Sequence, residues 1–247
     1  DACPTNPAPK DDGFALAKWQ DDAKERLRNA IELKELSAAT AEKISESTAD
    51  GVRITTYSLK TGEWSVPAVV IEPERTAETT TVLLGDKGKA SLIDTAAKLI
   101  ESGSRVVAID LFQQGECRLG GDNHYQYGAM VETAGERTLG QNVAQLGSAV
   151  EWARAELKSP VAIHSYGPVS GVIALMYGGL HRTELHRLTN EDALTSLKNL
   201  ITARMAYNEH YPLYCFGLLK EFDVPDLVAM CQGVQVNVKR VEGKAAQ

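Results

Sequence analysis

Residues 160–171 constrain the fold more than any other part of the sequence. A short apolar run, 161–163, leads into a turn that contains Gly167, and an apolar helical pattern begins at once at Val172. A short strand that passes through a tight glycine turn into a helix is typical of a sheet whose strands alternate with helices. Such a turn can also lift a serine to the end of a strand, and Ser165 lies in this turn.

Two patterns precede this region. Apolar residues at helical spacing predict an amphipathic helix over 14–36, and a second, short helix is predicted over 38–47. Alternating residues over 52–59 and 65–71, joined by a polar turn with Gly62, predict a β-hairpin.

Strands and helices then alternate toward the C-terminus. The predicted strands are 80–84, 105–110, 161–163 and 234–241, and the predicted helices are 91–102, 132–157, the run from 172, 182–200 and Val224–Met230. This order predicts an α/β fold with a mainly parallel sheet. Ligands of such sheets bind beyond the carboxyl ends of the strands, so we expect three loops, 85–90, 111–121 and 164–171, to form the binding edge.

The net charge and the composition of the chain argue against some classes of binding partner. The net charge of −7 argues against nucleic acids and anionic membranes, and no apolar run approaches the ~20 residues of a membrane span. The four cysteines contain no CxxC pair, so no zinc site is expected, while a disulfide from Cys3 stays open. The loop 85–89 lacks the G-x-x-x-x-G-K-[ST] spacing of a phosphate loop, so no nucleotide cofactor is expected either. The proline-rich start fits export.

Four motifs in this order resemble the acetyl-xylan-esterase-like branch of the α/β-hydrolase family. They are VPAVVIEPE (66–74), TVLLGDKGKA (81–90), SRVVAIDLFQQGEC (104–117) and FDVPDLVAM (222–230). The resemblance spans about 52–230 and implies a three-layer α/β-hydrolase-like domain with an N-terminal edge hairpin. It also implies hydrolysis of a carboxylic ester, an acetyl group on a carbohydrate, as the ancestral reaction. We expect a flexible leader over 1–12, a helical segment over 13–50 and a single hydrolase-like domain over 51–247.

The chain departs from the family pattern at the nucleophile. The family turn is Gly-x-Ser-x-Gly, whereas Ser165 has Gly167 after it but Ile163 before it. A second alignment of the turn puts Pro168 at the nucleophile position. The family acid and histidine follow the seventh and eighth strands, and this sequence ends at Gln247, just past what resembles the seventh.

A serine hydrolase needs a nucleophile, a base, an acid and two oxyanion donors. The candidates are Ser165 as nucleophile, His210 as base and Asp223 as the acid that orients it. The oxyanion donors would be the N–H of Tyr166 and one from the loop at Asp86. Each catalytic candidate also has a structural interpretation: a turn or capping serine, a hydrogen-bonded loop histidine and a helix-capping aspartate.

Other reactive residues are given structural roles. Asp110 ends a strand and braces the following loop in the family. Cys117 would need a lowered pKa to act as a nucleophile, and only Arg118 adjoins it. His181 and His186 are five residues apart, a poor spacing for a metal pair on a helix.

Three possibilities therefore stay open. The first is an esterase acting on a small-molecule or carbohydrate ester, in a rearranged site or one completed by a partner such as a second copy in a homo-oligomer. The second is a degenerate, non-catalytic domain that binds a carbohydrate or a protein. The third is one half of a tandem protein whose other domain carries the chemistry.

Overall fold

The computed structural model describes residues 3–9, 13–49, 51–119 and 123–239. Within them, one eight-stranded sheet has the order β1-β2-β3-β5-β4-β6-β7-β8. The strands are β1 Thr40–Ala49, β2 Val52–Thr61, β3 Trp64–Pro73, β4 Thr79–Gly85, β5 Ser104–Ile109, β6 Val161–Tyr166, β7 Arg187–Glu191 and β8 Gln235–Lys239. The pairs from β1 to β5 are antiparallel, and those from β5 to β8 are parallel.

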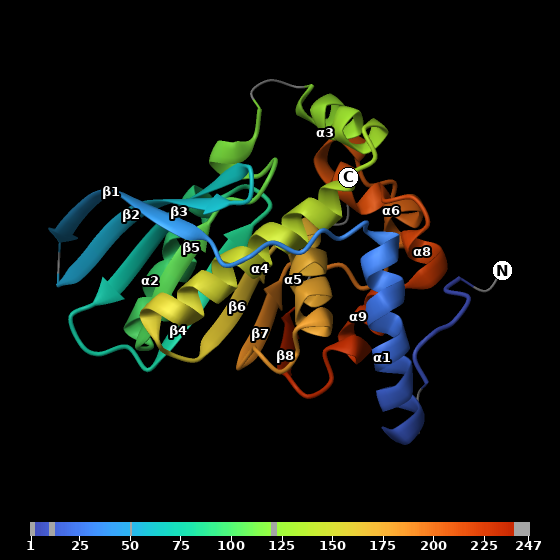
Figure 1. The fold of residues 1–247 in the computed structure, drawn as a ribbon, viewed down its shortest axis with the longest axis horizontal. Helices are drawn as coiled ribbons and strands as arrows, with labels where there is room; N and C mark the ends of the chain where they lie inside the picture. The colour runs from blue at the N-terminus through green and yellow to red at the C-terminus, as the bar shows by residue number, and fades with distance from the viewer. Residues whose placement is uncertain (1–2, 10–12, 50, 120–122, 240–247) are drawn as a thin grey trace.

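Helices cover both faces of this sheet, as the alternation of elements predicts (Figure 1). The longer ones are α1 Gly13–Ala30, α2 Ile93–Glu101, α3 His124–Thr133, α4 Thr138–Leu157, α5 Pro168–Leu180 and α9 Val224–Met230. The shorter ones are α6 Asn199–Thr202, α7 Tyr207–His210, α8 Leu218–Glu221 and the 3₁₀ turns η1 Lys89–Leu92, η2 Gly115–Cys117 and η3 Tyr211–Tyr214. The chain therefore forms the three-layer α/β architecture expected from the sequence.

The two faces of the sheet bury separate apolar clusters. On one face, Leu92 of the turn before α2 and Ala96 of α2 pack with Leu83, Val106 and Ala108 of the central strands. The larger cluster lies on the other face, where α1, α4, α5 and α9 contribute buried side chains. This larger cluster holds α5, and with it the turn after β6, against the sheet.

Two helix predictions were wrong. Residues 38–47 were expected to be helical, but β1 occupies Thr40–Ala49 and pairs with β2. Residues 182–200 were also expected to be helical, yet β7 at Arg187–Glu191 lies between β6 and β8. In both segments the hydrogen bonds offered by neighbouring strands override a weak local helix propensity.

The hairpin and the last helix were predicted correctly. β2 and β3 pair around the turn at Gly62. Asp223 caps α9 in a reciprocal capping box with Asp226, and Pro225 lies in the first turn. Among the described helices, none has the length and apolar character needed to cross a membrane.

Candidate ligand-binding site

The turn between β6 and α5 carries a glycine and a proline where a serine hydrolase carries its chemistry. Gly167 has a φ of 106° and precedes Pro168, the first residue of α5. In serine hydrolases the nucleophile occupies the sharp turn between strand and helix, and the next backbone N–H helps to form the oxyanion hole. Here the residue with the positive φ is a glycine, which has no side chain to act as a nucleophile, and the next residue, Pro168, has no N–H.

Asp86, in the loop after β4, reaches across to this turn. Its carboxylate accepts hydrogen bonds from the backbone N–H groups of Val169 (3.0 Å) and Ser170 (2.7 Å). It therefore places negative charge at the N-terminus of α5, where the helix dipole favours it. The backbone N–H of Asp86, expected to donate to an oxyanion, donates to the carbonyl of Tyr166 at 3.1 Å.

The pKa of the Asp86 carboxyl is raised above its usual value. Burial is the main cause, because it disfavours the charged form. The hydrogen bonds from Ser170 and Val169 and the charge of His210 act in the opposite direction. Asp86 therefore gains a proton more readily than a carboxyl group in water.

Ser165 lies inside the sheet, with its side chain fully buried. Its hydroxyl donates to Oδ1 of Asn190 at 2.5 Å, and the Asn190 amide donates in turn to the carbonyl of Gly171 at 3.1 Å. This chain of hydrogen bonds joins β6, β7 and α5. The structure gives Ser165 an amide partner instead of an imidazole.

The other predicted catalytic residues have local partners of their own. His210 ends α7, and its Nδ1 lies 3.1 Å from the carbonyl oxygen of Ala206. Tyr166 is paired with both Gly85 and Glu191 as the last residue of β6.

Asp223 is engaged at the start of α9. Its carboxylate accepts from Ser196 Oγ and the N–H of Leu197, both at 2.6 Å, and from the N–H of Val224 at 2.8 Å. No hydrogen bond joins any two of Ser165, His210 and Asp223, all of which the structure describes.

A small polar cavity, which we call the amide pocket, opens beside Asp86 at the carboxyl edge of the sheet. Its volume is about 30 Å³. The lining residues are Asp86, Phe112, Gln113, Gln114, Arg118, His124, Asn142, Val169, Glu209, Tyr211 and Pro212. These residues come from the predicted binding loops 85–90 and 111–121, from the three helices α3, α4 and α5, and from α7 and η3.

Three amide side chains in this pocket are buried without full hydrogen bonding. Gln113, Gln114 and Asn142 are 7%, 4% and 1% exposed. Oε1 of each glutamine and both polar atoms of the Asn142 amide have no hydrogen-bond partner among the described residues. Each of these atoms has less than 1 Å² of accessible surface, and a buried group of this kind costs about 1–3 kcal/mol when nothing pairs with it.

The backbone of Gln113 is strained. Its φ is +62°, a left-handed conformation that is uncommon for residues other than glycine. Strain of this kind costs of order 1–3 kcal/mol and clusters at binding and active sites. Gln114 is held by a hydrogen bond from its Nε2 to Ser170 Oγ at 3.2 Å, which ties the pocket to α5.

Aromatic rings extend from the pocket toward the surface in one connected row. His124 lies 6.2 Å from Tyr211 and 6.1 Å from Tyr125, and Tyr207 lies 5.8 Å from Tyr125 and 5.1 Å from Tyr214, between ring centroids. Arg118 Nη2 approaches His124 Nδ1 at 2.9 Å. Tyr207 is 43% exposed, so the row reaches solvent.

This edge of the sheet was predicted from the sequence to bind ligands, but its buried amide side chains were not predicted. The loop 111–121 was expected at the binding edge, yet neither glutamine was singled out, although two adjacent amides a few residues after a buried strand were a usable signal. Asn142 was hidden inside a helical pattern in which only its apolar neighbours were considered.

The remaining reactive side chains have structural roles. Asp110 accepts from the N–H of Lys89 (2.6 Å), from Lys89 Nζ (2.8 Å) and from the N–H of Glu116 (2.9 Å), which braces the loop. Burial, followed by the charge of Asp110, raises the pKa of Cys117 to about 11, the opposite of what a thiolate nucleophile needs. His164 pairs with Glu191 at 3.5 Å.

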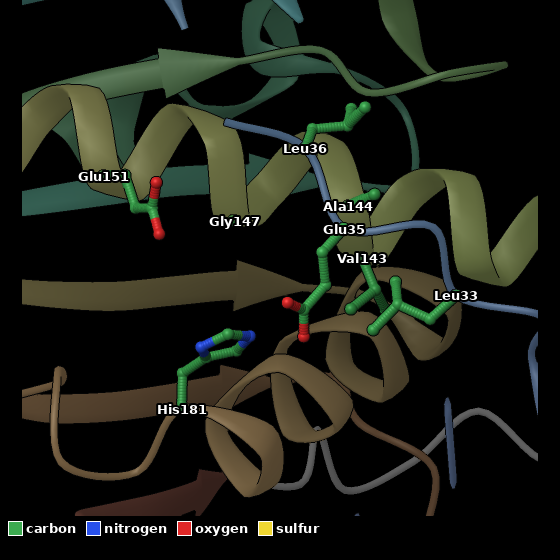
Figure 2. A pocket seen from close by; sticks show the side chains of 8 residues that line it. All are labelled: Leu33, Glu35, Leu36, Val143, Ala144, Gly147, Glu151 and His181. Atoms are coloured by element: carbon green, nitrogen blue, oxygen red, sulfur yellow. The ribbon is translucent and has the colours of Figure 1, made fainter. Parts of the chain in front are cut away.

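A second small cavity, of about 40 Å³, lies away from the carboxyl edge. Figure 2 shows that the carboxylates of Glu35 and Glu151 and the imidazole of His181 face it. Glu35 pairs with Arg28 at 3.0 Å, and His181 stacks on Tyr177 and pairs with Glu184 at 3.4 Å. No cluster of three metal-ligating side chains is found in the described ranges, so this cavity remains a gap between the 33–36 segment, α4 and the end of α5.

No family model and no curated protein sequence matches this chain. Solved structures do match it. A protein of Bacteroides fragilis assigned as an acetyl xylan esterase has a TM-score of 0.80 at 12% identity, over 95% of this chain and 71% of its own. Acetyl xylan esterase 1 of Thermoanaerobacterium sp. JW/SL YS485 matches with a TM-score of 0.61 at 13% sequence identity, over 97% of this chain and 89% of its own. The acetyl xylan esterase of Paenibacillus sp. R4 matches with a TM-score of 0.58 at 11% identity, over 97% of this chain and 92% of its own. At these identities the similarity shows the fold, so the chain has an α/β-hydrolase-like fold of the kind found in esterases.

Proposed function

We propose that this protein is an esterase-like domain that binds a carbohydrate or carbohydrate ester without hydrolysing it through a serine. The proposal rests on one observation at the turn after β6. The turn after β6 offers Gly167 and Pro168, and the carboxylate of Asp86 occupies the adjoining N-terminus of α5. An oxyanion forming there would meet a carboxylate and lack a backbone donor.

The choice of ligand is supported by the chemistry of the same edge. The amide pocket presents amide groups beside the charged side chains of Asp86, Arg118 and Glu209, and the adjoining row of rings supplies flat apolar faces. A sugar presents both kinds of surface, because its hydroxyl groups are polar and its C–H faces are apolar. The acetyl xylan esterases that share the fold are named for carbohydrate esters.

The catalytic part is tested with a fluorophosphonate probe and p-nitrophenyl acetate. We expect neither labelling nor turnover, because Ser165 is buried and donates to Asn190. Labelling at Ser165 that Ser165→Ala abolishes would overturn this and restore the esterase hypothesis with His210 as base. The measurement is made over a range of protein concentrations, because a site completed by a second copy would label only when the copies associate.

The binding part is tested by isothermal titration calorimetry with xylo-oligosaccharides and their acetylated forms. We expect saturable binding and intact ligand at the end of the titration. The absence of heat with any saccharide, together with the absence of labelling, would reject the carbohydrate function and leave the protein-binding interpretation.

A further inference from the structure

We infer that an open apolar groove beside α2 docks an amphipathic helix of another polypeptide, one with an aliphatic face and basic residues near its ends. The groove lies on the sheet face that carries the smaller apolar cluster, and it shares no lining residue with the amide pocket. The inference is therefore independent of the proposed carbohydrate function.

The floor of the groove is formed by aliphatic side chains of the antiparallel strands. Ile54 of β2 and Ile71 of β3 point away from the face that buries Leu59 and Val70, because side chains alternate along a strand. Both isoleucines are only half-buried. This part of the sheet therefore leaves apolar surface in contact with solvent.

Helix α2 forms the wall of the groove with an apolar stripe. Ile93, Ala97 and Ile100 all line it, at the spacing that places side chains on one face of a helix. Ile93 is 70% exposed, although the isoleucine side chain is strongly apolar. The groove has a volume of about 710 Å³ and holds charged residues at its ends. A contiguous exposed apolar surface with a polar rim is typical of a protein interaction site.

The geometry of the sheet leaves the place of one helix beside α2. Among the described residues, η1 and α2 supply every helical member of the cluster on this face, and they pack on β3, β4 and β5. Strand β2 lies two positions from β5 in the sheet. With strands about 4.8 Å apart, a helix over β2 would lie about 9–10 Å from α2, close to the usual spacing of packed helices.

The charges at the ends of the groove favour a basic partner. Lys89 pairs with both Asp110 and Glu116 at the end where α2 begins, and Glu101 is the last residue of α2. Among the described residues that line the groove and their ion-pair partners, Lys89 is the one positive charge against three carboxylates. A helix with lysine or arginine near its ends complements this distribution.

The same charges argue against two other occupants. A second copy of this chain would bring its own carboxylates to the groove, and the chain carries a net charge of −7. An anionic membrane surface would be repelled by the three carboxylates as well. The partner is therefore a separate polypeptide that docks a helix in the groove.

The test follows the isoleucine methyl groups of the full chain, labelled with ¹³C. The isoleucines that line the groove are Ile54, Ile71, Ile93 and Ile100, whereas Ile201 of α6 is 72% exposed and lies outside it. The probe is a synthetic helical peptide with a leucine face and lysines at both ends. We expect saturable shifts of the groove signals and an unchanged signal for Ile201.

Two matched peptides separate the helical and the charge requirements. A peptide with glutamates in place of the lysines should bind about fivefold more weakly at low salt, and added salt should reduce this difference. A peptide with a central proline, which breaks the helix, should bind at least tenfold more weakly. Equal binding of all three peptides, or no shift of the groove signals with the lysine peptide, would overturn the inference.

Variants assign binding to the groove. Ile93→Ser should weaken binding of the lysine peptide about tenfold, whereas Ile201→Ser, at a similarly exposed isoleucine, should leave it unchanged. Glu101→Gln should reduce the preference for the lysine peptide, whereas Glu156→Gln, at an exposed position of α4, should not. All four positions are exposed, so the variants are expected to fold. Unchanged affinity in Ile93→Ser would refute the site.

Two further results would assign the groove to another occupant and reject the helix. Shifts of the groove signals with the concentration of the protein alone would show that a second copy occupies it. Shifts produced by phosphatidylcholine vesicles and not by the lysine peptide would show that the groove binds a lipid surface.

Discussion

The carboxylate of Asp86 lies where a side chain on Gly167 would have to stand. A Cβ added at Gly167 would be 2.5 Å from Cγ of Asp86 and 2.6 Å from its Oδ2. The two residues come from the loops after β4 and β6, which the parallel sheet brings to the same edge. The space that a nucleophile would occupy is thus taken by a carboxylate from another segment, so restoring a serine requires two changes.

Gly167→Ser should therefore destabilise the protein and give no esterase activity. With φ 106° and ψ 164°, the backbone of Gly167 lies in a region that is essentially restricted to glycine, which costs of order 1–3 kcal/mol for a residue with a Cβ. The contact with Asp86 adds roughly 1–3 kcal/mol of overpacking. Urea unfolding measures the loss. Adding Asp86→Gly should recover the overpacking part only, and activity should stay absent because Pro168 has no N–H to donate. Turnover of p-nitrophenyl acetate by either variant would contradict this account.

The raised pKa of Asp86 predicts a pH-dependent difference in stability between the wild type and Asp86→Asn. A carboxyl group whose pKa is higher in the folded state binds more protons there than in the unfolded chain. Its contribution is therefore fully present below the unfolded pKa, near 3.8, and is lost as the pH rises through the folded value. As the pH falls from 7 toward 4, the wild type should gain stability relative to Asp86→Asn.

Chemical denaturation of both proteins at several pH values measures this difference. The other titrating groups are common to the two chains and largely cancel, so the slope belongs to Asp86. A flat difference would show that the hydrogen bonds to α5 offset burial, and a difference that falls toward low pH would show that they outweigh it.

The central strands and helix α9 could be predicted from the sequence because they depend on local patterns of residues. Apolar runs at 80–84, 105–110 and 161–163 became β4, β5 and β6, and Asp223 with Pro225 marked the start of α9. Strand β1 was missed although its partner β2 follows it directly, with Ala49 opposite Val52, because its largely polar and exposed residues give no apolar alternation. Strand β7 was missed because its partners lie far along the chain: Arg187 pairs with Gln235.

The site was harder to predict than the fold, for a related reason. The motif around Ser165 directed attention to a hydroxyl, but its burial depends on Asn190, a residue of a strand that the sequence did not predict. Similarly, Asn142 becomes a pocket residue only because α4 brings it beside the loop of Gln113 and Gln114. A linear motif reports the residues of a turn, whereas chemistry depends on what other segments place beside them.

Ser165→Ala should lower stability and leave ligand binding unchanged. Removing the hydroxyl takes the donor from the buried Oδ1 of Asn190, which costs about 1–3 kcal/mol. Ser91→Ala is the matched control, because its hydroxyl donates to the carbonyl of Gly88 in a partly buried turn, where water can substitute. We expect a smaller loss for the control in thermal unfolding. A Ser165→Ala variant as stable as wild type would mean that the Asn190 contact contributes no net stability.

Alkylation should distinguish Cys117 from a catalytic thiol. Burial raises the pKa of its thiol to about 11, which lowers the thiolate fraction near neutral pH. Iodoacetamide at pH 7.5 should therefore modify Cys117 far more slowly in the folded protein than in guanidinium, as followed by peptide mass spectrometry. Cys215, whose pKa burial also raises to about 11, serves as the internal comparison, because it is buried and lies away from Asp110. Rapid labelling of folded Cys117 alone would indicate an activated thiol and would reopen its role as a nucleophile.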